Sequence, residues 1–155
     1  FNRRHLQQEV KQAYLTYQRY QRPATLLLLD VDYFKRVNDE FGHDVGDQAL
    51  CTIVDMIKDR LRIMDHVFRY GGEEFVVLLM ETDETHAIHV AEELRSHIEQ
   101  ANIVPSGSVT VSIGVCDVLQ ADSIDHWQNQ CDRALYQAKA EGRNRVVIAT
   151  PAPLA

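Results

Sequence analysis

Blocks of apolar and polar positions follow one another along the chain and predict alternating helices and strands. Residues 3–21 are polar with apolar side chains at helical spacing, which predicts an amphipathic helix that ends before Pro23. Residues 24–31 form a continuous apolar run, typical of a central strand buried on both faces. Farther along, the patterns predict helices over about 47–61, 85–100 and 124–140, and strands over about 109–115 and 145–148.

Two glycines, Gly71 and Gly72, separate a further pair of apolar runs at about residues 66–80. Paired glycines are typical of hairpin turns, because glycine adopts positive φ at little cost. We therefore expect a hairpin here, with positive φ at both glycines. Residues 33–41 form a short polar segment, and Gly142 is expected to end the last helix as a capping glycine.

The order of these elements predicts the fold class. It contains a β-α-β-β-α-β series, the ferredoxin-like arrangement, so we expect an α/β (α+β) fold with a mixed central sheet flanked by helices. A length of 155 residues favours one domain, which we place at residues 1–150, with a tail at 151–155. The chain begins inside a helical pattern without Met, so we expect it to be cut from a longer protein.

Composition limits the kinds of partner. The net charge is −7, so electrostatics do not favour nonspecific binding to nucleic acid. We find no apolar run long enough to cross a bilayer and recognise no signal peptide, so we expect no membrane insertion by this domain, although its parent protein could be tethered. Three widely spaced cysteines without a Cys-x-x-Cys pattern indicate reduced thiols in a cytoplasmic protein.

Carboxylates occur at two places that the predicted fold could bring together. Asp30 ends the buried strand, and ligands bind at the carboxyl ends of strands in such sheets. Glu73 and Glu74 lie at the expected hairpin turn. Sparse carboxylate ligation suits Mg²⁺, and the Val31 carbonyl could add another oxygen. Alternatively, Asp30 caps the following helix and the two glutamates are solvated turn residues.

The segment that follows Asp30 is dense in polar side chains and glycine. Lys35 could place a positive charge on a phosphate, and Asn38 and Asp47 could bind the edge of a purine. Gly42 and Gly46 allow the chain to turn closely around a ligand. The plainer interpretation is a polar surface loop with Asp47 as a helix N-cap.

These residues belong to blocks that resemble the GGDEF-domain family of diguanylate cyclases, and the blocks span nearly the whole chain in the family's order. The resemblance implies the palm-like fold of nucleotidyl cyclases. The matching positions are Asn2-Arg3-Arg4, Leu29-Asp30-Val31-Asp32, Phe34-Lys35, Asn38-Asp39, Gly42-His43, Gly46-Asp47, Arg69, Gly71-Gly72-Glu73-Glu74-Phe75, Thr110-Val111-Ser112-Ile113-Gly114-Val115, Asp132, Ala134-Leu135-Tyr136, Ala138-Lys139 and Gly142-Arg143-Asn144.

The resemblance implies an enzyme that condenses two GTP into cyclic di-GMP and releases two pyrophosphates. It assigns Asp30, the Val31 carbonyl and Glu73 as ligands of two Mg²⁺ or Mn²⁺ ions in each active site. Glu73 occupies a position at which many members have Asp, and it is also the candidate proton acceptor for the ribose 3′-hydroxyl. Glu74 would support the metal ions.

The resemblance also implies a set of GTP contacts. Lys35 would stabilise the transition state, and Asn38 and Asp47 would bind the guanine. For His43, a hydrogen bond within its own loop is an equally good interpretation. The implied GTP-binding residues are Asn38, His43, Asp47, Gly71, Gly72, Lys139 and Arg143.

Two expectations concern assembly and control. Each nucleotide must attack the other, so a homodimer with one GTP in each domain is expected to be the active species. Arg62 and Asp65 match the family's product-inhibition site for cyclic di-GMP, whereas a surface ion pair is the alternative. Two other functions are kept open, a catalytically silent GTP or cyclic di-GMP-binding module and a different purine nucleotidyltransferase.

Overall fold

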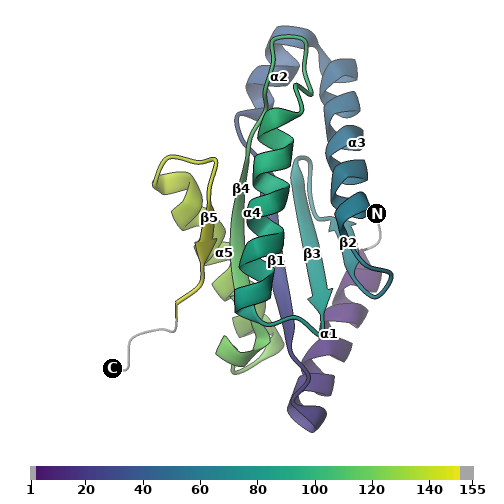
Figure 1. Cartoon of the computed structure of the whole chain (residues 1–155), viewed down its shortest axis with the longest axis vertical. Coiled ribbons are helices and arrows are strands. Elements are labelled where there is room, and N and C mark those ends of the chain that lie inside the picture. The colour runs from purple at the N-terminus through teal and green to yellow at the C-terminus, as the bar shows by residue number, and fades with distance from the viewer. Residues whose placement is uncertain (1–2, 151–155) are drawn as a thin grey trace.

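The structure, a computed structural model, describes residues 3–150, so the predicted tail at 151–155 lies outside the described residues. Helices and strands follow one another along the chain, with α2 followed directly by α3 and β2 by β3 (Figure 1). In chain order they are α1 (Arg3–Tyr20), β1 (Ala24–Val31), α2 (Phe34–Phe41), α3 (His43–Arg60), β2 (His66–Arg69), β3 (Glu74–Met80), α4 (Glu84–Gln100), β4 (Val111–Asp117), the 3₁₀ helix η1 (Val118–Gln120), α5 (Ile124–Ala140) and β5 (Val146–Ile148).

The five strands form one sheet in the order β2-β3-β1-β4-β5. Neighbouring strands are antiparallel except for β5, which runs parallel to β4. The series β1-α3-β2-β3-α4-β4 with this strand order is the ferredoxin-like arrangement, and β5 extends its edge. The predicted fold class, a mixed sheet flanked by helices, is therefore confirmed.

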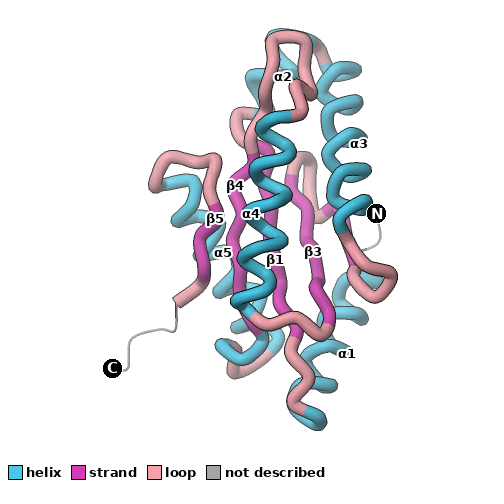
Figure 2. Tube along the Cα trace, in the orientation of Figure 1, coloured by secondary structure: helices cyan, strands magenta, loops and turns pink. Residues whose placement is uncertain are grey.

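Helices cover both faces of the sheet, as Figure 2 shows. Odd-numbered side chains of β1, such as Leu27 and Leu29, pack in the core beneath α3 and α4. Even-numbered ones, such as Leu26 and Leu28, pack in a second core beneath α1 and α5. All eight residues of β1 are buried, because successive side chains of a strand point to opposite faces. Alternation therefore places Asp30 on the face that α5 covers.

The structure corrects the interpretation of residues 33–41 as a polar surface loop, because Phe34–Phe41 form helix α2. Phe34 and Val37 are buried one turn apart, so a short apolar stripe exists within the polar sequence. Helix α3 begins at His43, so Asp47 lies inside it and is not its N-cap. Gly42 separates the two helices with φ 89° and ψ 164°, a conformation that favours glycine. Other predicted bounds differ by about two residues or fewer.

The predicted positive φ at Gly71 and Gly72 is wrong, because neither belongs to the positive-φ glycines of the chain. The Tyr70 N–H closes the turn by donating to the Glu74 carbonyl at 2.8 Å. Arg69 supports it, because its guanidinium donates to the carbonyls of Gly71 at 3.2 Å and Gly72 at 2.7 Å. A Cβ atom at Gly72 would meet nothing within 4 Å. The paired glycines therefore leave open space at the hairpin tip.

The C-terminal end of α5 confirms the expected glycine cap. Gly142 has φ 126°, its N–H points to the carbonyl of Lys139, and the N–H of Arg143 donates to the carbonyl of Ala138 at 2.9 Å. These two bonds form a Schellman motif, which reverses the chain directly after the helix. The motif returns Arg143 and Asn144 to the sheet.

Within residues 3–150, no helix is both long enough and apolar enough to cross a lipid bilayer.

We predict that Gly114→Ala strongly destabilises the fold. A Cβ atom at Gly114 would lie 2.4 Å from the backbone nitrogen of Leu135 and 2.6 Å from the carbonyl oxygen of Cys131, so α5 would have to move away from β4. The expected loss in free energy of unfolding is about 1–3 kcal/mol, measured by urea denaturation. Gly72→Ala is the control and should change stability by less than about 0.5 kcal/mol; equal losses in both variants would contradict the packing argument.

Candidate active site

The carboxyl end of β1 meets the hairpin tip between β2 and β3. The register of β1 with β3 sets Asp30 opposite Glu74, and the N–H of Val31 donates to the carbonyl of Glu73 at 3.1 Å. The structure therefore brings together the residues that the sequence predicted as an acidic site from two separate segments. Asp30 is almost fully buried, whereas Glu73 and Glu74 are half-buried.

The pKa of the Glu74 carboxyl group responds to its surroundings. Burial raises the pKa of Glu74, and the negative charge of Asp30 and a hydrogen bond to it raise it further. The Lys139 ammonium opposes this shift and lies 2.6 Å from Asp30 Oδ2. Glu73 also raises the Glu74 pKa, so its charge acts on the same site. The site thus concentrates more negative charge than its single lysine offsets.

The donor chemistry of this site fits a hard divalent cation. Oxygen ligands are what Mg²⁺ requires, and closely opposed carboxylates are stabilised by a cation between them. Within residues 3–150, however, no three His, Cys, Asp or Glu side chains are arranged as a ready-made metal cage. This accords with Mg²⁺ sites that use one or two carboxylates together with water and substrate phosphates.

The predicted guanine-binding residues lie where α2 meets α3. Asn38 is half-buried, and its Oδ1 atom is buried without a hydrogen-bond partner. Gly46 makes room for this oxygen, because a Cβ atom there would lie 1.8 Å from it. His43 and Asp47 are exposed on the first turns of α3, and Lys35 is exposed on α2. The side chains of Lys35, His43 and Asp47 therefore border solvent, whereas the Asn38 oxygen lies beneath the surface.

Lys139 and Arg143, both predicted to bind GTP, make different contacts in the structure. Lys139 pairs with Asp30, whereas the Arg143 guanidinium carbon lies 4.7 Å from the centre of the Tyr33 ring. The guanidinium carbon of Arg36 lies 4.5 Å from the centre of the same ring. Tyr33 and Arg36 were not selected from the sequence, because spacing along the chain does not show that the α5–β5 turn reaches α2.

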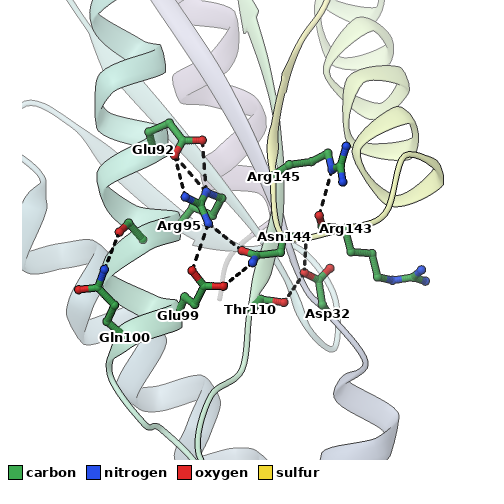
Figure 3. Close-up of polar contacts among 10 residues, drawn as sticks. Asp32, Glu92, Arg95, Glu99, Gln100, Thr110, Arg143, Asn144 and Arg145 are labelled. Atoms are coloured by element: carbon green, nitrogen blue, oxygen red, sulfur yellow. Dashed lines mark hydrogen bonds and ion pairs between the residues drawn. The ribbon is translucent and has the colours of Figure 1, made fainter.

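Asp32 is a further residue whose importance appears only in the structure (Figure 3). Its carboxylate accepts hydrogen bonds from Thr110 Oγ1 at 2.7 Å, Ser112 Oγ at 2.6 Å and the Asn144 N–H at 3.0 Å. The Asn144 side chain in turn contacts Arg95 and Glu99 of α4. Asp32 therefore ties the end of β1 to β4 and to the turn after α5. The sequence placed Asp32 in a matching block two residues after Asp30 but gave it no role.

Arg62 and Asp65, the predicted inhibition site, pair with each other at the turn before β2. Arg62 Nε lies 3.1 Å from Asp65 Oδ2, and its Nη2 donates to the Met80 carbonyl at 2.6 Å. Both arginine and aspartate line a surface pocket of about 340 Å³, together with Arg60, His86 and His89. The Asp65 side chain is only 2% exposed, so Arg62 is the more accessible member of the pair.

Comparisons with known proteins agree with this geometry. A family profile described as diguanylate cyclase, GGDEF domain, matches residues 1–145. The chain is 44% identical over 125 residues to the diguanylate cyclase DgcM of Escherichia coli K12, covering 81% of this chain and 30% of that protein. The active GGEEF domain of a diguanylate cyclase from Vibrio cholerae superposes with a TM-score of 0.92 at 31% identity, covering 97% of this chain and 98% of that one.

A second solved structure, the GGDEF domain of DgcB from Caulobacter crescentus in complex with c-di-GMP, has a TM-score of 0.88 at 29% identity. It covers 96% of this chain and 90% of that one. Fold and site together define a ferredoxin-like α/β domain with an acidic site at a strand end. The chain belongs to the GGDEF-domain family of diguanylate cyclases. It spans about 30% of the length of the curated relatives it matches.

We predict that Mg²⁺ stabilises the nucleotide-free domain through Glu74. Millimolar Mg²⁺ should raise the melting temperature of the wild type, because a ligand that binds only the folded state shifts the folding equilibrium. Glu74→Gln should remove this shift, as measured by differential scanning fluorimetry with and without Mg²⁺. Glu84→Gln is the matched control, since burial also raises the Glu84 pKa but Glu84 lies at the other end of the sheet beside Asp117. An undiminished shift in Glu74→Gln would contradict the assignment.

The raised Glu74 pKa also gives a pH dependence without metal. The pKa of the Glu74 carboxyl group is higher in the folded protein than in the unfolded chain. Such a group contributes stability at pH values below its unfolded-state pKa, and this contribution is lost as the pH rises through its folded-state pKa. Glu74→Gln should therefore raise the metal-free melting temperature at pH 8, with little effect near pH 4. A melting temperature that falls equally at both pH values would show that Glu74 has a structural role instead.

Proposed function

We propose that this chain is the catalytic domain of a diguanylate cyclase, which condenses two GTP into cyclic di-GMP and releases two pyrophosphates. The observation that carries the proposal is the convergence of Asp30, Glu73 and Glu74 at the end of β1, in a chain that belongs to the GGDEF family. All of these positions keep a carboxylate, with Glu73 where many members have Asp, which favours an active enzyme over a silent binding module.

In this proposal, the acidic residues hold two Mg²⁺ or Mn²⁺ ions. Asp30, Glu73 and the Val31 carbonyl are the ligands, and Glu74 supports them from the facing strand. The bound ions would neutralise phosphate charge and lower the pKa of the ribose 3′-hydroxyl. Glu73, half-buried at the hairpin tip, is our candidate acceptor for the hydroxyl proton.

Several side chains would bind the nucleotide. The unpartnered, buried Asn38 Oδ1 supports a role in guanine binding, since a donor from the base would relieve the cost of leaving it unpaired. Asp47 would accept hydrogen bonds from the guanine N1 and N2 groups, with His43 nearby. Gly71 and Gly72 leave space for the ribose and α-phosphate, consistent with their open surroundings.

Positive side chains would bind the triphosphate. Lys35 is exposed on the first turn of α2 and would stabilise the negative charge on the oxygens of the α-phosphate in the transition state. Lys139, which pairs with Asp30, would also contact the phosphates, and Arg143 would add a planar guanidinium. These charges let an acidic protein bind an anionic substrate.

Bond formation happens twice in each catalytic cycle. The 3′-oxygen of one GTP forms a bond to the α-phosphorus of the other, the bond from that phosphorus to pyrophosphate breaks, and the hydroxyl proton is removed. The same exchange with the roles reversed closes the ring. One domain that holds one GTP cannot perform both, so we propose a homodimer with the nucleotides facing across a two-fold axis.

We also propose the wider setting of the domain. Residues 1–150 would form one catalytic domain followed by a tail, within a longer protein. The three cysteines are free thiols, two of them buried, which supports a reducing compartment such as the cytoplasm. Cyclic di-GMP would act as feedback inhibitor at Arg62 and Asp65, and the complex of the related DgcB domain with c-di-GMP supports product binding in this family.

We expect Glu73→Gln to abolish cyclic di-GMP formation while the melting temperature changes little. The substitution removes one charge and one metal ligand from an exposed turn but no core packing. Product is measured by chromatography after incubation with GTP and Mg²⁺ across a series of protein concentrations, because a dimeric enzyme loses specific activity on dilution. ATP in place of GTP is the specificity control. The proposal fails if wild-type protein binds GTP but never releases pyrophosphate.

We expect Arg62→Ala to weaken inhibition by cyclic di-GMP at least about tenfold, because bidentate, charge-assisted hydrogen bonds of about 1.5–3 kcal/mol would be lost. The readout is the inhibition constant of the product, with the uninhibited rate recorded alongside. Ile63→Ala is the matched control, since Ile63 is the fully exposed neighbour of Arg62 and no polar contact is removed. An unchanged inhibition constant in Arg62→Ala would reject this site.

A further inference from the structure

Tyr33 is an exposed aromatic residue held in an unfavourable backbone conformation. It precedes α2 with φ 55° and ψ 33°, in the left-handed region that side chains other than glycine, asparagine and aspartate rarely adopt. Its side chain is 50% exposed and makes no hydrogen bond that caps the helix. Neither core packing nor capping therefore explains it. Strained residues of this kind concentrate at functional sites.

Two guanidinium groups from different parts of the chain lie over this ring. The guanidinium carbon of Arg36, on α2, lies 4.5 Å from the ring centre, and that of Arg143, in the turn after α5, lies 4.7 Å from it. The negative face of an aromatic ring attracts cations at such distances. One ring can thus hold two like charges near each other and offset part of their repulsion.

The backbone that carries Arg143 is fixed separately from its side chain. The Asn144 N–H donates to Asp32 Oδ2 at 3.0 Å, and Arg145 Nε donates to the Arg143 carbonyl at 3.1 Å. In Figure 3 the Arg143 side chain extends away from the Arg95–Glu99 network. Within residues 3–150, the guanidinium groups of Arg36 and Arg143 make no hydrogen bond or ion pair with protein atoms, so the Tyr33 ring is their shared specific contact.

We propose that Tyr33 is a positioning residue that aims both Arg36 and Arg143 at the triphosphate, which makes Arg36 an additional phosphate-binding side chain. This inference rests on the proposed cyclase function. The N–H groups of both guanidiniums are free of protein acceptors, and planar guanidinium forks match phosphate oxygens. Tyr33 lies between Asp32 and Lys35 in sequence, directly after the strand that carries Asp30. Tyr33 therefore lies only a few residues along the chain from the proposed phosphate site.

Arginine side-chain NMR tests the positioning without nucleotide or turnover. In protein labelled with ¹⁵N-arginine, ring currents should displace the Hε resonances of Arg36 and Arg143, which Arg36→Lys and Arg143→Lys assign. Tyr33→Leu should return both resonances toward the values of solvent-exposed arginines, whereas Tyr33→Phe, which keeps the ring, should retain the displacement. Resonances that do not respond to Tyr33→Leu would overturn the positioning role.

Substrate kinetics and binding test the consequence. Tyr33→Leu should raise the KM for GTP about three- to fivefold, because a cation–π contact at an exposed site is lost. The kcat and the melting temperature should stay nearly unchanged. Tyr33→Phe, which keeps the ring, should restore the wild-type KM. In an Arg36→Ala/Arg143→Ala background, Tyr33→Leu should raise KM no further. An equal rise in that background, or a matching loss of stability, would overturn the inference.

The matched control is Tyr20, which is 60% exposed and lies under Arg19 and Arg22, before the opposite end of β1. Tyr20→Leu removes the same kind of contact away from the site and should leave KM unchanged; a rise equal to that of Tyr33→Leu would count against a local effect.

Dissociation constants for a non-hydrolysable GTP analogue are measured in parallel. If wild-type protein forms no cyclic di-GMP, the cyclase function fails, yet a Tyr33-dependent affinity for the analogue would still support the positioning role.

Discussion

The cross-strand pairing of Asp30 with Glu74 is the constraint on which the site depends. Two carboxylates set opposite each other in a sheet destabilise it, and burial strengthens the effect. The sheet tolerates the pair because β1 is held on both sides by β3 and β4 and on both faces by helices. A slip of the register by one residue would move Asp30 to the other face, away from Lys139. The apolar core of β1 therefore maintains an arrangement that the acidic residues alone would not adopt.

A second set of contacts joins the parts of the site that lie far apart in sequence. Asp32 accepts hydrogen bonds from β4 and from the turn after α5, while Tyr33 contacts arginines from α2 and that same turn. The Schellman motif at the end of α5 makes this possible, since it reverses the chain at Gly142. The end of β1 is thus linked to three other segments within a few residues, which limits how far the proposed phosphate-binding side chains can move.

Much of the fold could be predicted from the sequence because its periodicities are strong. The apolar run at 24–31, the helical stripes and the glycine after α5 each follow from local rules that the structure obeys. Helix α2 was missed because its apolar stripe is short and lies among charged residues. The conformation of Gly71 and Gly72 was predicted wrongly because Arg69 supports the turn through side-chain hydrogen bonds, which no turn preference anticipates.

The sequence by itself determined the chemical types at the site, namely acidic residues after a buried strand and at a glycine turn, and the family to which they belong. Only the tertiary structure decided which groups meet. It paired Asp30 with Glu74 and Lys139, set Asp32 against Asn144, and brought Arg36 and Arg143 to one tyrosine ring. The physical reason is that these contacts depend on strand register and on the direction in which helices cross the sheet. Both are set by packing over the whole core rather than by local sequence.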